Sequence, residues 1–595
     1  MDYHNNTDGL ANLEKLAEKI SRTLNGNLNR GVPIVLVPGF SGWGTPLFGA
    51  INYWGGIENL PEQLAAEGHT VIVTPIAPIS SNWERACELY AQLTSPKFTI
   101  YDLEAKKFPD HPDTIDVDYG ENFPRKHGYV RVARGRKAAI LFTQNPGEWE
   151  NWVWNDQNPV HFVCHSQGGN TVRYLLHLLE RGSLSRDNTP THSRYFEQPG
   201  RSKWAISVFT IGTPHRGTTV IDVLHDLFKT SNLSEKTKLI GRLFATLSFN
   251  DPNDRIYDLQ LDHWGIKRCN RGPSQKETFS EMRTRLESMT WQSEAGPVRK
   301  WIESNHNGFY DNSILGVNEL NDKTIPTSCE IYYFSLSFSC VQKFPKHWPP
   351  WTLEALQRFP LTIGRFLTSI PLVGNVAQFL QGVVKAIPFV GNLVPDIPKL
   401  SAQFAEEIYK LILTNIASVG GWHIISTLVN LQDVVKWSVN SAINPFLDQV
   451  GYNVRIPEPG NYLPITSIFP LMFVTAYAMG GKNLSVNQKH VLGEDASNWH
   501  LNDGVVNTES MKGPLNRNGD LPSNRNQELI ADACEFPLGQ VHTARGKYWH
   551  FGVTSGIDHA DEIGIFIQET TANATVKMYK DLVAIVSHLP QAKIL

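Results

Sequence analysis

The segment from His161 to Asn170 constrains the fold of this chain more than any other part of the sequence. It reads His-Phe-Val-Cys-His-Ser-Gln-Gly-Gly-Asn, and a leucine-rich helical run follows it. An apolar strand therefore ends at Ser166, and the glycines behind the serine allow a helix to begin close against that strand. Strain in such a turn exposes the serine hydroxyl above the sheet, which is the geometry of a nucleophile elbow. Cys164 stands where the usual Gly-x-Ser-x-Gly pattern has its first glycine, a position that needs only a small residue.

Short apolar strands alternate with helical patterns along much of the chain. Because strands separated by helices form βαβ units, the sequence predicts an α/β fold with a mostly parallel central sheet. The formal net charge of −4 gives no general attraction to nucleic acid, and six cysteines in 595 residues do not form a disulfide framework. The strand-like runs lie at 33–37, 70–73, 161–164, 205–211 and 331–337, and the first helical patterns lie at 10–24, 62–67 and 81–93.

Residues 341–455 differ in composition from the rest of the chain. No Asp, Glu, Lys or Arg occurs between Arg365 and Lys385 or between Lys410 and Asp433, which explains much of the low charged fraction of 19%. Each run approaches the ~20 residues that span a bilayer, but prolines, glycines and polar residues interrupt both. We therefore predict an apolar helical cap inserted between late elements of the sheet. A membrane span and a surface that dips into lipid are the alternatives.

A catalytic serine needs a base to accept its proton and an acid to orient that base. In this type of fold both partners follow the serine in the chain. Two later loops fit: residues 502–507, with Asp503 before a glycine, and residues 556–561, with His559 before the last helical pattern. From the residues alone, His542 and His550 are alternatives for the base.

Longer blocks of the sequence resemble the secreted lipases of Geobacillus and Staphylococcus. The resemblance extends over about 31–340 and 456–595 and implies an α/β-hydrolase fold with Ser166, Asp503 and His559 as its catalytic triad. It also implies an oxyanion hole formed by the backbone N–H groups of Phe40 and Gln167. The blocks include Gly-Phe-Ser-Gly-Trp-Gly at 39–44, Ser-Ser-Asn-Trp-Glu-Arg-Ala-Cys-Glu at 80–88, His-Ser-Gln-Gly-Gly at 165–169, Thr-Pro-His-Arg-Gly-Thr-Thr at 213–219 and Asn-Asp-Gly-Val-Val-Asn at 502–507.

On this interpretation the chain has an N-terminal helical extension and a hydrolase core in two parts, separated by the cap. Apolar residues from Leu239 to Leu247 repeat at helical spacing where the relatives have a lid, whose apolar face covers the site in water. A helix that faces the core is the alternative. The expected boundaries are 1–30 for the extension, 31–340 for the first part of the core with the lid at about 221–250, 341–455 for the cap and 456–595 for the second part.

The relatives bind a structural zinc through two aspartates and two histidines, and here the matching positions hold other residues. Two carboxylates with two aromatic rings do not form a zinc site, so we predict no zinc. At the relatives' calcium site Asp561 is retained, but Phe566 stands at a second ligand position, which predicts no calcium and no cofactor. The four positions matching the zinc ligands are Glu84, Phe123, Tyr129 and Asp262.

We therefore expect a serine lipase that hydrolyses long-chain carboxylic esters, with acylglycerols as substrates, through an acyl-enzyme. An acyltransferase with the same triad and a lipid-binding protein with residual hydrolase activity are the alternatives. The expected partners are a lipid or other ester and, transiently, a lipid interface, whereas the oligomeric state stays open. The sequence shows no signal peptide after Met1, which predicts an intracellular protein or a mature chain, with peripheral membrane contact.

Overall fold

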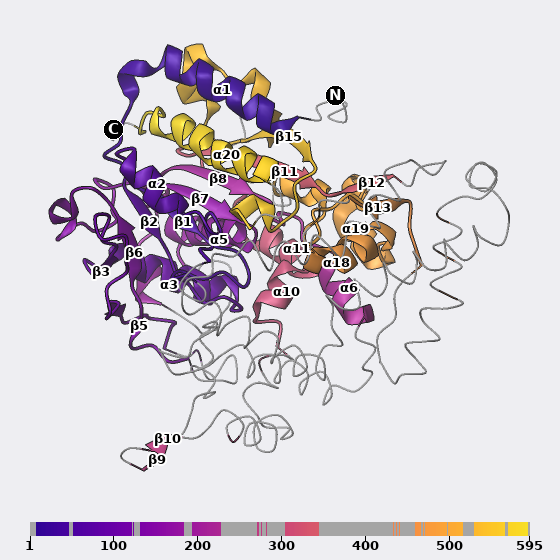
Figure 1. The fold of residues 1–595 in the computed structure, drawn as a ribbon, viewed down its shortest axis with the longest axis horizontal. Coiled ribbons are helices and arrows are strands. Elements are labelled where there is room, and N and C mark those ends of the chain that lie inside the picture. Colours follow the sequence, from indigo (N-terminus) through magenta and orange to yellow (C-terminus); the bar gives the residue numbers. More distant parts are fainter. Residues whose placement is uncertain are drawn as a thin grey trace.

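A nine-stranded sheet is the centre of the part of the chain that the computed structural model describes. That part comprises residues 8–46, 51–121, 131–183, 193–227, 304–343, 458–515, 529–565 and 569–592. A few positions inside these ranges are not described, and a few isolated residues between the ranges are. The strand order is β14-β15-β11-β8-β7-β1-β2-β6-β3. All neighbours are parallel except β2 and β6, which confirms the predicted α/β fold with a mostly parallel sheet (Figure 1).

The strands of this sheet are mostly short, and three further pairs lie outside it. In sheet order the strands are β14 (Ile530–Asp532), β15 (Tyr548–Ser555), β11 (Tyr332–Ser339), β8 (Ala205–Ile211), β7 (Val160–His165), β1 (Ile34–Val37), β2 (Val71–Val73), β6 (Ala139–Phe142) and β3 (Phe98–Ile100). The outer pairs are β4 (Thr114–Ile115) with β5 (Arg136–Lys137), β9 (Asn270–Gly272) with β10 (Gln275–Lys276), and β12 (Val341–Lys343) with β13 (Tyr462–Pro464).

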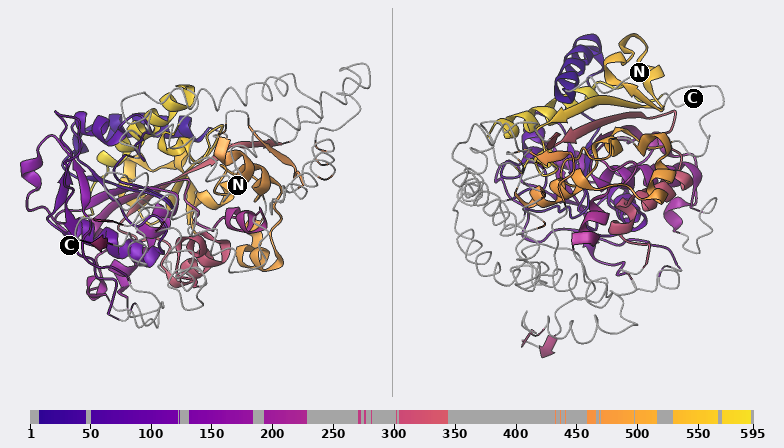
Figure 2. Two further views of the ribbon diagram at one scale, coloured as in Figure 1. Left: turned by 60° about the horizontal axis from the view of Figure 1, so that its bottom comes forward. Right: turned by 90° about the vertical axis from the view of Figure 1, so that its right-hand side faces the viewer.

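Helices cover both faces of the sheet (Figures 1 and 2). Helix α3 (Asn82–Thr94) has Ser81 as its N-cap, and the side chains of Ser81 and Glu84 form a reciprocal capping box. The described α-helices, apart from several short 3-10 helices, are α1 (Gly9–Thr23), α2 (Leu60–Ala66), α3 (Asn82–Thr94), α5 (Gln167–Arg181), α6 (Val220–Leu227), α10 (Gly308–Asn312), α11 (Ile314–Lys323), α18 (Pro470–Gly481), α19 (Val486–Leu492) and α20 (Glu569–Ser587).

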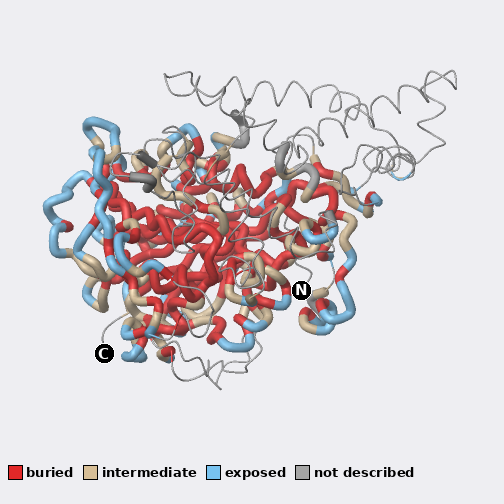
Figure 3. Tube along the Cα trace, turned by 90° about the horizontal axis from the view of Figure 1, so that it is seen from below, coloured by how far each residue is buried: buried red, intermediate tan, exposed pale blue. Residues whose placement is uncertain are grey.

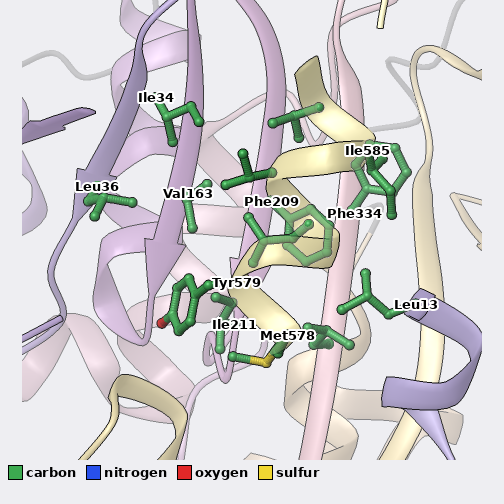
Figure 4. Packing of buried hydrophobic residues seen from close by; sticks show 14 of the residues in the cluster. Leu13, Ile34, Leu36, Val163, Phe209, Ile211, Phe334, Met578, Tyr579 and Ile585 are labelled. Atoms are coloured by element: carbon green, nitrogen blue, oxygen red, sulfur yellow. The ribbon is translucent and has the colours of Figure 1, made fainter. Parts of the chain in front are cut away.

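Alternate side chains of β1 enter different layers of the core. Ile34 and Leu36 belong to the apolar cluster that α1 and α20 close, and Figure 4 shows part of that cluster. Val35 and Val37 belong to the cluster on the other face, which includes residues of α3 and α5. Both faces are therefore covered, as expected for parallel strands, and the centre of the molecule is buried along most of the trace (Figure 3).

The structure brings the two ends of the predicted insertion together. Strands β12 and β13 pair antiparallel, with Lys343 opposite Tyr462, so the chain leaves and returns at neighbouring positions. After Lys343 the predicted cap (341–455) lies almost entirely outside the described residues, as does the 239–247 stripe of the predicted lid. Among the helices that are described, none has the length and apolar character needed to cross a membrane.

Replacing Leu13 with alanine is expected to destabilise the fold by about 2–5 kcal/mol, because its fully buried side chain joins α1 to the cluster under α20. Urea unfolding followed by circular dichroism measures this loss. Leu28→Ala removes the same atoms from a side chain that is 42% exposed, so it is expected to change the free energy of unfolding little. Equal losses in the two variants would contradict the packing described here.

Candidate active site

Ser166 lies in a strained turn between β7 and α5. Its backbone angles are φ 53° and ψ −131°, a conformation that a non-glycine residue adopts at a cost of about 1–3 kcal/mol. The Ser166 N–H donates to the carbonyl of Ile211, at 2.9 Å, which ties the turn to the adjacent strand β8. The structure thus places the serine at a sheet edge with its backbone fixed, as the sequence pattern predicts.

The glycines after the serine are required by close contacts. A Cβ atom at Gly168 would lie 2.4 Å from the carbonyl oxygen of Val37, and one at Gly169 would lie 2.3 Å from Oγ1 of Thr213. Both distances are far below a van der Waals contact. Helix α5 can therefore approach the strands only because these two positions lack side chains.

Asp503 and His559 meet although 56 positions separate them in the chain. Nδ1 of His559 lies 2.7 Å from Oδ2 of Asp503, and both side chains are buried. The other oxygen of Asp503 accepts hydrogen bonds from the N–H groups of Val505 and Val506, at 2.8 and 2.7 Å. These donors fix the carboxylate, which in turn directs the Nδ1 proton and leaves Nε2 of His559 as the basic nitrogen.

The other two candidate histidines have different environments. His550 is buried in β15 with Nε2 2.8 Å from Oγ of Ser337, and burial lowers its pKa to about 3. His542 is exposed on a short turn. Of the three histidines, His559 has the carboxylate partner that a catalytic base needs.

The electrostatics of His559 favour its charged form. Burial lowers the pKa of His559, but the carboxylates of Asp503 and Glu562 outweigh this effect, and together they raise the pKa to about 10. An imidazolium formed when this histidine accepts a proton would therefore be stabilised. Glu562 is a residue that the sequence analysis missed, because nothing in its spacing separates it from the acidic turn in which it lies.

The loop after β1 packs directly against Ser166. A Cβ at Gly39 would lie 2.5 Å from Cβ of Ser166. The fully buried guanidinium of Arg85 donates to the carbonyls of Pro38 and Gly39, at 2.5 and 3.3 Å, and fixes this loop. Within the described residues, the backbone N–H groups of Phe40 and Gln167 have no hydrogen-bond partner. They are therefore available as donors to an oxyanion, the role expected from the resemblance.

An apolar cavity of about 210 Å³ opens at Ser166. Two of its walls come from segments that flank the predicted lid and cap, since α6 lies at the start of the lid range and α18 follows the cap. The two helices pack together through Val220 and Val223 of α6 and Ala478 and Met479 of α18. The cavity is lined by Phe40, Ser166, Pro214, Thr218, Val220, Ile221, Leu224, Gly308, Phe309, Asn312, Met472, Thr475, Val505 and Val506.

The described positions that match the relatives' zinc ligands already have protein partners. One carboxylate oxygen of Glu84 lies 3.2 Å from Nε of the buried Arg131, and the other accepts from the N–H of Ser81, at 3.1 Å. Phe123 is buried beside the ring of His306. Tyr129, Asp262 and Phe566 lie outside the described residues.

Among the described residues, one group has side chains close enough for a metal, namely His165, His559 and Glu562. All three already interact with protein partners. His559 is bonded to Asp503, and His165 lies between Glu562 and Tyr53. The arrangement therefore fits a hydrogen-bonded base better than a metal centre.

Comparisons with known proteins find similarity to bacterial lipases. A family model described as lipase-like, C-terminal domain, matches residues 30–343. The lipase of Staphylococcus hyicus is 27% identical over 309 residues, which are 51% of this chain and 39% of that protein. Lipase 1 of Staphylococcus aureus strain MRSA252 is 27% identical over 302 residues, 49% of this chain and 36% of that protein. The matches thus span about two fifths of these relatives' own length.

Solved structures show the same fold. EstA from Clostridium botulinum has a TM-score of 0.52 at 21% identity, and the alignment covers 98% of this chain and 99% of the EstA chain. The crystal structure of Staphylococcus hyicus lipase has a TM-score of 0.50 at 18% identity, and the alignment covers 94% of this chain and 96% of the lipase chain. These similarities confirm the α/β-hydrolase fold.

Asp503→Asn is expected to slow the reaction of Ser166 with a p-nitrophenyl phosphonate by about 10⁴-fold. An amide nitrogen would donate to His559, and the ring would lose the tautomer that leaves Nε2 free. Release of p-nitrophenol measures the rate. Asp532→Asn, in the edge strand β14, removes an equal charge elsewhere and is expected to react at the normal rate. Similar rates in the Asp503 variant and the unsubstituted chain would exclude this carboxylate from the site.

Proposed function

The chain belongs to the lipase-like family whose model matches residues 30–343, and from this premise we propose that it is a serine lipase. Its substrates are long-chain carboxylic esters, with acylglycerols as the expected class. One observation carries the proposal: Ser166 opens into an apolar cavity at the sheet edge to which the Asp503–His559 pair also belongs. An acyl chain gains about 0.8 kcal/mol for each methylene that such a cavity removes from water.

The reaction follows from the roles that these groups can take. Nε2 of His559 accepts the hydroxyl proton as Oγ of Ser166 attacks the ester carbonyl carbon. The N–H groups of Phe40 and Gln167 donate to the oxyanion that forms. Asp503, fixed by two backbone donors, keeps the imidazole in the reactive tautomer and stabilises the imidazolium.

Collapse of the tetrahedral intermediate breaks the bond to the alcohol, which leaves with the proton from His559. Water then attacks the carbonyl carbon of the acyl-enzyme and gives its proton to His559. As the bond to Oγ breaks, His559 returns this proton to Ser166 and the fatty acid is released. The acyl chain lies along the wall of the cavity that Ile221, Leu224 and Met472 contribute. The segments next to the predicted lid and cap therefore determine which lengths of acyl chain the cavity accepts.

Ser166→Ala is expected to lower kcat for p-nitrophenyl esters by about 10⁴-fold or more, because no other group forms the acyl-enzyme. A series of esters from short to long acyl chains, with and without an emulsion, shows in addition which chains the cavity prefers. Ser95→Ala, on the partly exposed residue after α3, is the matched control. Full esterase activity in the Ser166 variant would contradict the proposal, and transfer of the acyl group to added alcohols in preference to water would favour an acyltransferase.

We also propose that catalysis requires neither zinc nor calcium. At the positions that match the relatives' zinc ligands, Glu84 is already held by Arg131 and Ser81. A set of two carboxylates and two aromatic rings is also a poor zinc site. Dialysis against EDTA is expected to leave the melting temperature and the rate of ester hydrolysis unchanged. Elemental analysis of the untreated protein provides the control. Stoichiometric metal, or a loss of stability that added zinc or calcium restores, would overturn this proposal.

A further inference from the structure

Helix α5 carries a buried cation two turns after Ser166. Arg173 is only 3% exposed, and none of the described residues forms a hydrogen bond with its Nε, Nη1 or Nη2. The groups that act on it electrostatically are the phenols of Tyr548, on β15, and Tyr333, on β11, and no carboxylate of the described residues is among them. In the part of the chain that the structure describes, the guanidinium is therefore enclosed without a counter-charge.

A guanidinium in this position is unfavourable unless an anion compensates it. Burial removes the hydration of an ion, and buried charges in folded proteins are paired for this reason. Burial lowers the pKa of Arg173 to about 10, which still leaves the side chain protonated at neutral pH. The side chain thus does not avoid the cost by losing its proton, and it needs a negative partner.

The carboxylate of Glu509 is already paired with other cations. It lies 3.5 Å from Nη1 of Arg216 and 2.8 Å from Nζ of Lys512. Burial, followed by the charges of Arg173 and Arg216, holds the pKa of His215 well below its usual value. Among the described groups that act on His215, positive charge therefore exceeds negative charge, which favours the binding of an anion over that of a cation.

Two further buried polar atoms near Arg173 have no hydrogen-bond partner among the described residues, namely the hydroxyl of Tyr548 and Nδ1 of His215. The centroids of these two rings are 5.0 Å apart, and the ring of Tyr333 lies 5.0 Å from that of Tyr548. The charge of Arg173 acts on both groups. Helix α5, two strands and the loop after β8 thus bring unsatisfied polar groups to one buried place.

The donors at this place define the class of ligand. The guanidinium has five N–H groups, and the hydroxyl of Tyr548 has one proton. Tyr333 accepts from the N–H of Ser328, at 2.9 Å, so its own proton can also be donated. Such donors fit a small monovalent anion, either a halide or a planar oxyanion on the guanidinium fork. A second negative charge would exceed the single charge of Arg173.

His215 distinguishes between kinds of anion. The hydroxyl of Thr210 donates to the carbonyl of Phe334, at 3.0 Å, so it accepts from Nε2 of His215, at 3.1 Å. Because burial keeps the ring neutral, Nδ1 has a lone pair. An oxyanion that carries a hydroxyl group, such as bicarbonate, satisfies this acceptor, whereas chloride and formate do not.

We propose that Arg173, Tyr548 and Tyr333 bind one small monovalent anion, which neutralises the guanidinium and ties helix α5 to strands β11 and β15. These side chains belong neither to the triad nor to the oxyanion hole, so the anion site is independent of the proposed function. It is nevertheless close to the substrate cavity along the chain, because Pro214, next to His215, lines that cavity.

The test measures the melting temperature of the full chain at about pH 8 and constant ionic strength, as sodium gluconate is replaced by sodium chloride, formate or bicarbonate. Gluconate is too large for an enclosed site. A ligand that binds only the folded state stabilises it with the logarithm of its concentration. At least one small anion is therefore expected to raise the melting temperature by about 2 °C for each tenfold increase above half-saturation. A melting temperature that none of the three anions changes would overturn the proposal.

Arg173→Met removes the cation and keeps a side chain of similar length. The anion effect is expected to disappear, and in gluconate the variant is expected to be at least as stable as the unsubstituted chain, because a buried unpaired charge has been removed. Arg201→Met is the matched control, since Arg201 donates to the carbonyl of Gln198 and the hydroxyl of Tyr90, at 2.7 and 3.0 Å. It is expected to keep the full anion effect. Effects of equal size in the two variants would overturn the site at Arg173.

Tyr548→Phe provides a test that also applies if Arg173→Met does not fold. It removes one donor, keeps the ring and changes no charge, so the anion concentration for half of the effect is expected to rise about tenfold. An unchanged concentration would overturn the place of Tyr548 in the site.

The three anions also separate the kinds of ligand. Bicarbonate is expected to act at a lower concentration than formate, because its hydroxyl group can donate to Nδ1 of His215. Equal half-saturating concentrations would overturn that contact.

None of these measurements depends on ester hydrolysis. An anion effect that Arg173→Met abolishes, in a chain that hydrolyses no ester, would support the anion site and reject the lipase. Ester hydrolysis that depends on Ser166, in a chain without an anion effect, would reject the anion site alone.

Discussion

The strained turn at Ser166 is the constraint on which the rest of the site depends. A positive φ at a serine persists only where the surroundings hold it, and here they do so from three sides. Strand β8 accepts the Ser166 N–H, and the contacts at Gly168 and Gly169 place α5 against β1 and the loop after β8. The hydroxyl therefore projects at the sheet edge where the loops carrying Asp503 and His559 also arrive.

Arg85 extends this constraint to the oxyanion loop. Its guanidinium is fully buried and donates to Pro38 and Gly39 in the loop, to Ala77 after β2 and, through Nε, to Thr171 on α5. One side chain of α3 thus fixes both halves of the candidate oxyanion hole relative to the nucleophile helix. Preorganisation of this kind is what an oxyanion site needs, since its donors must be in place before charge develops.

The sequence predicted five of the central strands and missed β6, although Ala139–Phe142 is apolar and buried, and it also missed the strands toward the edges of the sheet. Strands β1, β2, β7, β8 and β11 appear as apolar runs because helices cover them on both faces. The edge strands β3 and β14 have three residues each, and β15 mixes polar and aromatic residues, so none of them has a clear periodicity. Pairing with a neighbour, rather than local preference, makes these segments strands.

Local sequence determined the turn that presents Ser166, because its geometry depends on adjacent residues: an apolar strand, one serine and two glycines. Chain order and the resemblance then indicated Asp503 and His559. The residues alone left His550 as an alternative base, and the tertiary structure supplies the physical difference, since His559 has Asp503 as its partner and His550 has Ser337. It also decided that Glu562, which in the sequence is one acid among several, lies between two histidines. Contacts between residues nearly 400 positions apart have no signature in a single sequence.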